Sequence, residues 1–121
     1  MQDYLLMTDE QKDYVALVRN ILTKELLPHI HEYESANDGL GTYPLDVHYK
    51  MAEAGFYGMN IPEKWGGLDM DMITKGLIVE EIAKFDAGFA FSFFATGNFF
   101  PMIEATHMPD EEKQMWADKI L

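Results

Sequence analysis

Cysteine is absent from the 121-residue sequence. Its absence excludes disulfide cross-links, thiol catalysis and thiolate metal sites. Basic residues are also scarce, because nine lysines and arginines stand against 21 aspartates and glutamates and leave a formal net charge of -12. A surface of this sign repels nucleic-acid phosphates and anionic lipid head groups. We therefore expect neither nucleic acid nor a membrane among the partners of this protein.

Long hydrophobic runs are missing as well. The most apolar stretch, residues 87–103, is interrupted by Asn98 and Pro101, and it falls short of the roughly 20 apolar residues that cross a bilayer. Residues 1–8 contain no basic or long apolar segment and carry Asp3, so we expect neither a secretory signal nor a basic transit peptide. These absences predict a cytoplasmic protein.

Apolar residues at helical spacing are what the sequence does contain. Its 48% hydrophobic and 25% charged residues are typical of a globular protein, and the length predicts one domain. Thr8 and Gln11 form a predicted capping box at the start of a first helix, and Pro28 predicts a kink or stop near Leu27. The buried stripe of this helix is expected to be Val15, Val18, Leu22 and Leu26.

A short second helix is predicted downstream of the first. Pro44 suits its first position, and Gly55 suits the left-handed residue that ends many helices. Residues 55–71, rich in glycine and proline, then indicate a structured loop with apolar anchors. The inward face of the second helix is expected to consist of Leu45, Tyr49 and Ala52, with His48 beside them.

Three more helices complete the predicted fold. Asp71 is expected to cap a helix that runs to about Phe85. The helix that begins near Ala87 is apolar on nearly all sides, which predicts that it lies at the centre and bends or ends at Pro101. Residues 109–121 form the last helix, and no stretch alternates as a strand would. We therefore predict an all-α fold, a helical bundle of four to five helices.

Three stretches occur in an order that is typical of one enzyme family. The first is residues 8–12 leading to residues 24–29, with a Glu-Leu-Leu-Pro ending. The second and most specific is residues 55–68, which contain Gly-x-x-Gly, Ile-Pro-Glu and Trp-Gly-Gly. The third is residues 80–87, followed by a packed helix and by residues 109–113. Together they cover nearly the whole chain, which resembles the N-terminal helical domain of the acyl-CoA dehydrogenase family.

This resemblance implies an oxidoreductase of fatty acid metabolism that uses FAD to oxidise the α,β bond of an acyl-CoA thioester. In that family the flavin lies between a middle β-domain and a C-terminal helical domain, which also supplies the catalytic glutamate. Residues 1–121 are expected to be the N-terminal domain with both other domains absent. We therefore expect no catalytic, cofactor-binding or metal-binding residue and no activity from this chain alone.

The resemblance also bears on the origin and partners of the chain. The chain would be an expressed fragment, a truncated reading frame or one piece of a split enzyme. The implied partners are an acyl-CoA substrate, the middle and C-terminal domains and further copies in a homo-oligomer. For the complete enzyme, electron-transfer flavoprotein is a candidate electron acceptor.

One face of the apolar helix is the candidate substrate-binding site. Its residues Phe91, Phe94, Ala95 and Asn98 are spaced so that they lie on one side of a helix. The resemblance implies that this side forms a wall of the acyl pocket. Two phenyl rings there would shorten the cavity or suit an aromatic acyl group, and they argue against long acyl chains. The alternative is that these residues are ordinary bundle core.

Two pairs of polar residues invite other interpretations. Glu80 and Glu81 are adjacent on a helix and point in different directions, so we expect one at the surface and the other as a hydrogen-bonded structural acid. Glu104 and His107 have the spacing used by di-iron bundles, but such bundles need two of these motifs and the sequence has one. The alternative functions are a non-catalytic self-association or interaction module and a di-iron bundle.

Overall fold

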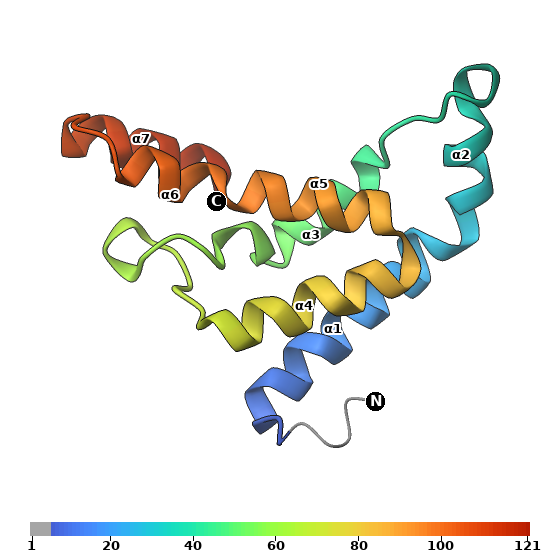
Figure 1. Cartoon of the computed structure of the whole chain (residues 1–121), viewed down its shortest axis with the longest axis horizontal. Coiled ribbons are helices and arrows are strands. Elements are labelled where there is room, and N and C mark those ends of the chain that lie inside the picture. The colour runs from blue at the N-terminus through green and yellow to red at the C-terminus, as the bar shows by residue number, and fades with distance from the viewer. Residues whose placement is uncertain (1–5) are drawn as a thin grey trace.

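The computed structural model describes residues 6–121, which form α-helices and short 3₁₀ helices (Figure 1). Within this range there is no strand, so the predicted all-α class is confirmed. Each helix predicted from the sequence is present, and two of them are broken in two. Most of the N-terminal segment in which we expect no targeting signal lies outside the described residues. None of the helices in residues 6–121 is long and apolar enough to cross a bilayer.

Helix α1 (Asp9–Glu25) begins at the predicted capping box. The backbone N–H of Gln11 donates to Thr8 Oγ1 at 3.1 Å, and the Thr8 N–H donates to Gln11 Oε1 at 3.0 Å. The whole predicted stripe of this helix is buried. Pro28 then lies in the 3₁₀ helix η2 (Leu27–His29), and the chain resumes as α2 (Ile30–Gly39). The break predicted at the proline is therefore confirmed.

Helix α3 (Leu45–Glu53) starts after Pro44 and is followed by Gly55 in a left-handed conformation with φ of 84°. The bounds agree with the prediction, but the predicted inward face is only partly right. Ala52 packs half-buried against the core and His48 is half-buried, whereas the prediction is wrong for Leu45 and Tyr49. Leu45 and Tyr49 are 50% and 56% exposed. Helix α3 packs against α1, and its buried face is centred on residues that the prediction did not name. Its fully buried residues are Val47 and Met51.

Helix α4 (Met72–Phe85), capped by Asp71 as predicted, occupies the centre of the fold. It packs against α1 on one side and against α5 (Ala87–Gly97) on the other (Figure 1). The expectation that the helix from Ala87 is the central one is therefore wrong. Only one side of α5 is covered, so Phe93 is fully buried whereas Phe91 is 72% exposed.

The chain beyond α5 breaks at Asn98, three residues before Pro101. It continues as α6 (Phe99–Glu104) and α7 (Asp110–Ile120), which pack against each other. This pair encloses a second small core with the loop that contains η3 (Phe56–Gly58) and η4 (Glu63–Trp65). The loop has the apolar anchors predicted for it, and the buried ones are Phe56, Tyr57, Met59, Ile61 and Trp65.

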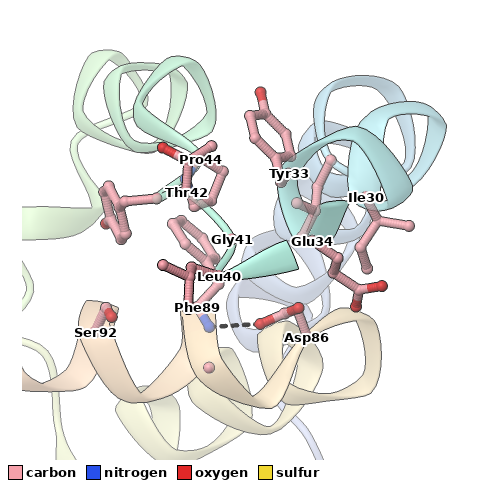
Figure 2. Close-up of a pocket in the computed structure, with 13 residues that line it drawn as sticks. Ile30, Tyr33, Glu34, Leu40, Gly41, Thr42, Pro44, Asp86, Phe89 and Ser92 are labelled. Atoms are coloured by element: carbon pink, nitrogen blue, oxygen red, sulfur yellow. Dashed lines mark hydrogen bonds between the residues drawn. The ribbon is translucent and has the colours of Figure 1, made fainter. Parts of the chain in front are cut away.

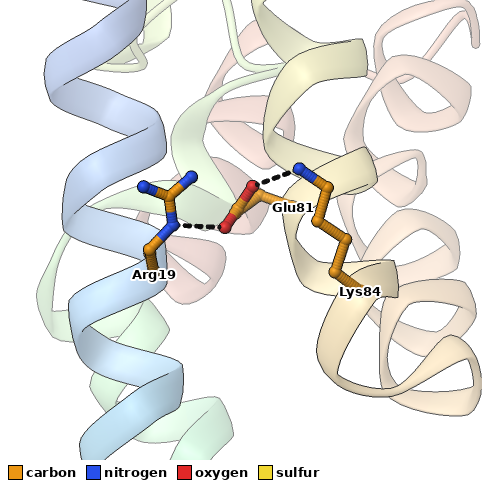
Figure 3. A network of polar contacts seen from close by, with 3 residues as sticks. All are labelled: Arg19, Glu81 and Lys84. Atoms are coloured by element: carbon orange, nitrogen blue, oxygen red, sulfur yellow. Dashed lines mark hydrogen bonds and ion pairs between the residues drawn. The ribbon is translucent and has the colours of Figure 1, made fainter. Parts of the chain in front are cut away.

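A buried carboxylate joins α1 to α4. Glu81 is 2% exposed, and its two oxygens accept from Arg19 Nε at 2.8 Å and from Lys84 Nζ at 3.0 Å (Figure 3). Burial by itself would raise the pKa of Glu81, but the hydrogen bonds from Arg19 and Lys84 outweigh it and hold this pKa below its usual value. Glu81 is thus the hydrogen-bonded structural acid of the glutamate pair, while Glu80 is half-buried.

Replacement of this carboxylate is expected to change how stability depends on pH. Because the pKa of Glu81 is lowered by folding, its ionised form stabilises the fold above about pH 5, and this stabilisation is lost as the pH falls below about 4. We expect Glu81→Gln to lower the free energy of unfolding by about 1–3 kcal/mol at neutral pH. We also expect a flatter loss of stability in acid, as measured by urea unfolding across a pH series. A variant that loses stability in acid as steeply as the parent contradicts this role.

Candidate functional site

A groove of about 440 Å³ runs between α4 and α5. Its volume lies within the range of about 300–1,000 Å³ that is usual for small-molecule sites. Most of its lining is apolar, and it has a single charged residue. The lining residues are Met59 and Asn60 from the loop, Met72, Lys75, Gly76 and Val79 from α4, and Phe94 and Asn98 from the end of α5.

The structure brings two of the four predicted site residues to this groove. Phe94 and Asn98 line it, and Phe94 is 51% exposed. Phe91 and Ala95 are also exposed but are not among its lining residues. The interpretation of all four as ordinary core does not fit, because none of them is fully buried.

The α4 side of the groove was missed by reasoning from the sequence. Gly76 has no side chain, and a Cβ added there would meet no atom within 4 Å. The space beside this part of α4 is therefore open. A glycine inside a helical pattern without a packing reason was the one signal available. Lys75 beside it gives no comparable signal, since a lysine on a helix is ordinarily a surface residue.

Two asparagine side chains close the loop end of the groove. Asn60 Nδ2 donates to the Gly97 carbonyl at 3.0 Å, and Asn98 Nδ2 donates to the Phe94 carbonyl at 2.8 Å. The Gly97 carbonyl lies at the C-terminal end of α5, where a helix leaves carbonyl groups unpaired, whereas the Phe94 carbonyl also accepts from the backbone N–H of Asn98 at 3.1 Å. The amide oxygens of both side chains are left as acceptors at the edge of the groove.

A second cavity, of about 400 Å³, lies between α2, the segment after it and the start of α5 (Figure 2). Phe89 and Tyr33 form part of its walls, and Glu34 and Asp86 are its charged residues. Asp86 also caps α5, because its Oδ1 accepts from the Phe89 N–H at 2.6 Å. The cavity therefore has aromatic walls and only negative charges.

A histidine and two tyrosines form a hydrogen-bonded cluster at this cavity, and Tyr43 is among its lining residues. His48 Nδ1 lies 2.7 Å from Tyr57 Oη and 2.9 Å from Tyr43 Oη. Burial lowers the pKa of His48 and raises that of Tyr57, which favours an uncharged imidazole that shares hydrogen bonds with the two hydroxyl groups. The cluster orients Tyr43, whose ring lies on that of Phe89 with centroids 5.9 Å apart.

The Glu104 and His107 pair has no metal-binding arrangement. Glu104 Oε1 accepts from Trp65 Nε1 at 3.0 Å and lies 3.3 Å from Lys64 Nζ, while His107 is exposed. The part of the chain that the structure describes has no group of three or more histidine, cysteine or acidic residues that could hold a metal ion. Glu104 instead ties the loop to α6.

Comparison with known proteins agrees with the motifs of the loop and helices. The family described as acyl-CoA dehydrogenase, N-terminal domain, matches residues 8–121. No solved structure gives a significant match.

Several curated relatives share part of the sequence. The probable acyl-CoA dehydrogenase YngJ of Bacillus subtilis (strain 168) is 35% identical over 78 residues, which are 64% of this chain and 20% of YngJ. Cyclohex-1-ene-1-carbonyl-CoA dehydrogenase of Syntrophus aciditrophicus (strain SB) is 29% identical over 89 residues, which are 74% of this chain and 20% of that protein. This chain spans about a fifth of the length of the curated relatives it matches.

Proposed function

The chain belongs to the acyl-CoA dehydrogenase family, and from this membership we propose that it supplies a wall of the acyl pocket in a flavin-dependent acyl-CoA dehydrogenase. The observation that carries the proposal is the groove between α4 and α5, an apolar hollow of about 440 Å³ lined by Phe94 and Asn98. Such a hollow can hold an acyl chain away from water while a thioester reacts elsewhere.

The side chains of α5 favour a short or aromatic acyl group. Phe94 lines the groove, and the ring of Phe91, one turn earlier, extends the same exposed side of the helix. Ala95 is exposed on the same helix, and Asn98 places an amide in the lining of the groove. The Phe94 ring takes up room in this groove that a long alkyl chain would need, and it can stack on a flat acyl group.

The flavin does not fit the residues described in this chain. Its pyrophosphate needs cations or free backbone N–H groups, yet the cavity in Figure 2 carries Glu34 and Asp86, and the groove carries one lysine. We therefore derive no redox step from these residues. In our proposal the complete enzyme holds FAD and the catalytic base in other domains and passes electrons to electron-transfer flavoprotein. This chain alone is expected not to reduce FAD in the presence of an acyl-CoA.

Binding of hexanoyl-CoA to the chain tests the proposed wall. We expect backbone amide shifts near Gly76 and Phe94 in nitrogen-15 NMR spectra, beyond those caused by coenzyme A alone. A Cβ at Gly76 meets no atom within 4 Å, and we expect the side chain of Gly76→Leu to occupy the groove. It should exclude at least two methylene groups, each worth about 0.8 kcal/mol. We therefore expect hexanoyl-CoA to bind this variant roughly tenfold more weakly. Equal binding by the variant and the parent contradicts the proposal.

The exposed apolar side chains also support a second function, as a self-association or docking surface. Met72, Ile73 and Phe91 are 77%, 70% and 72% exposed, and large apolar side chains that gather into an exposed patch are typical of protein interfaces. In this alternative the same face joins copies of the chain or further domains. Sedimentation velocity distinguishes it, because a chain that stays monomeric at high concentration does not use this face for self-association.

A further inference from the structure

Two neighbouring residues of α4, Lys75 and Gly76, line the groove. Each is unfavourable at its position in the helix. Gly76 lies inside the helix, where glycine costs about 1 kcal/mol relative to alanine, and no neighbouring atom requires it. Lys75 lies at the end of the first turn, near the positive end of the helix dipole, and no acidic residue occupies that turn. Residues that break local rules without a structural reason are expected at functional sites.

Lys75 also differs from the other cations of the chain. Seven of the nine lysines and arginines have a hydrogen bond, ion pair or aromatic ring as partner, namely Lys12, Arg19, Lys50, Lys64, Lys84, Lys113 and Lys119. Among residues 6–121, Lys24 and Lys75 have none. Lys24 is exposed in the last turn of α1, where a cation is favourable. Lys75 is half-buried beside an apolar groove.

The acidic residue one turn before Lys75, Asp71, is hydrogen-bonded to Thr74. The carboxylate of Asp71 accepts from the Thr74 N–H at 3.0 Å and from the Thr74 hydroxyl at 2.6 Å. The other lining residues are uncharged, and Asn60 and Asn98 use their amide nitrogens to bind α5 carbonyls. In a chain with a net charge of -12, the ammonium group of Lys75 is therefore available to an anion that enters the groove.

We propose that the groove takes an acyl group that carries a carboxylate, and that Lys75 is the residue that selects it. The proposal rests on the proposed function of the groove as an acyl-binding wall. One ammonium group matches the single charge of a carboxylate, whereas a phosphate dianion needs further donors that the groove does not supply. The apolar lining holds the methylene chain, and Gly76 gives the ligand room against the backbone of α4.

A pair of methyl esters tests this selection without the phosphates of coenzyme A. Monomethyl adipate and methyl hexanoate have the same ester and methylene chain and differ only in a terminal carboxylate or methyl group. We expect the amides near Gly76 to report monomethyl adipate binding roughly tenfold more tightly than methyl hexanoate. High salt should reduce this preference, because it screens a partly exposed ion pair.

Two variants separate the proposed role from a general charge effect. Lys75→Met keeps an unbranched apolar side chain of similar helix propensity, and we expect it to bind the two esters about equally. Lys24→Met removes the other unpaired lysine at a distance from the groove, and we expect it to keep the preference of the parent. Neither lysine has a side-chain partner to lose, so we expect thermal unfolding of both variants to stay close to that of the parent. The helix dipole should make Lys24→Met slightly less stable and Lys75→Met slightly more stable.

The outcomes distinguish the two proposals. If both esters shift the groove amides with equal affinity, or if Lys75→Met keeps the preference, the carboxylate selection is wrong while the acyl-binding wall stands. If neither ester shifts these amides but both bind elsewhere or not at all, the groove is not an acyl site and both proposals fail.

Discussion

Gly67→Ala is expected to lower the free energy of unfolding by about 3 kcal/mol or more. A Cβ at Gly67 would overlap the carbonyl oxygen and the Cβ of Ile61. Ile61 cannot move aside, because its side chain is fully buried and its carbonyl accepts from the Asp69 N–H at 3.0 Å. The substitution therefore opens the loop that closes the groove and the second core.

Two other glycines provide matched controls for this substitution in urea unfolding experiments. Gly66→Ala places a side chain at a φ of 94° and 3.3 Å from Leu121 Cδ1, and we expect a loss of about 1 kcal/mol. Gly76→Ala meets open space in a helix, and we expect a gain of about 0.5–1 kcal/mol. If all three variants have similar stability, the close approach of Gly67 to Ile61 is not present in the folded protein.

Phe93→Ala is expected to lower the free energy of unfolding by about 3–5 kcal/mol. Phe93 is fully buried, and its ring lies on that of Tyr57 with centroids 5.0 Å apart. Its removal leaves a cavity between α5 and η3 that the packed core cannot fill without moving a helix.

Phe91→Ala, two residues earlier, is the matched control. Phe91 is 72% exposed, so its removal should change stability by no more than about 0.5 kcal/mol. Chemical denaturation of both variants at equal concentration measures the contrast. If Phe91→Ala is as destabilising as Phe93→Ala, this side of α5 is covered in solution and cannot be the open wall of a pocket.

The candidate site was only half predictable from the sequence, for a physical reason. Helical spacing places Phe94 and Asn98 on one side of α5, because that relation depends on the helix alone. A groove needs a second wall, and nothing in the spacing of α5 indicates that α4 brings Gly76 and Lys75 opposite Phe94. That pairing depends on contacts between helices.

The position of α5 shows the limit of composition as evidence. Its apolar residues on all sides predicted a central helix, yet α4, with Glu81 and a mixed surface, is the helix that packs on both sides. A helix is apolar on all sides either because the rest of the protein covers it or because it presents apolar side chains at the surface, for example to a ligand or a partner. The sequence does not separate these cases, since both produce the same pattern.

Local chemistry therefore determined the helices, and packing decided their roles. Thr8 and Asp71 set helix starts through hydrogen bonds to residues within one turn, and Pro28 breaks a helix because it has no backbone N–H. The sequence by itself was therefore sufficient for these boundaries and for the all-α class. The buried face of α3, the central place of α4 and the groove beside Lys75 follow from which helices meet, and those contacts join residues that are far apart in the chain. Only the tertiary structure could decide them, because burial is a property of the neighbours as well as of the residue.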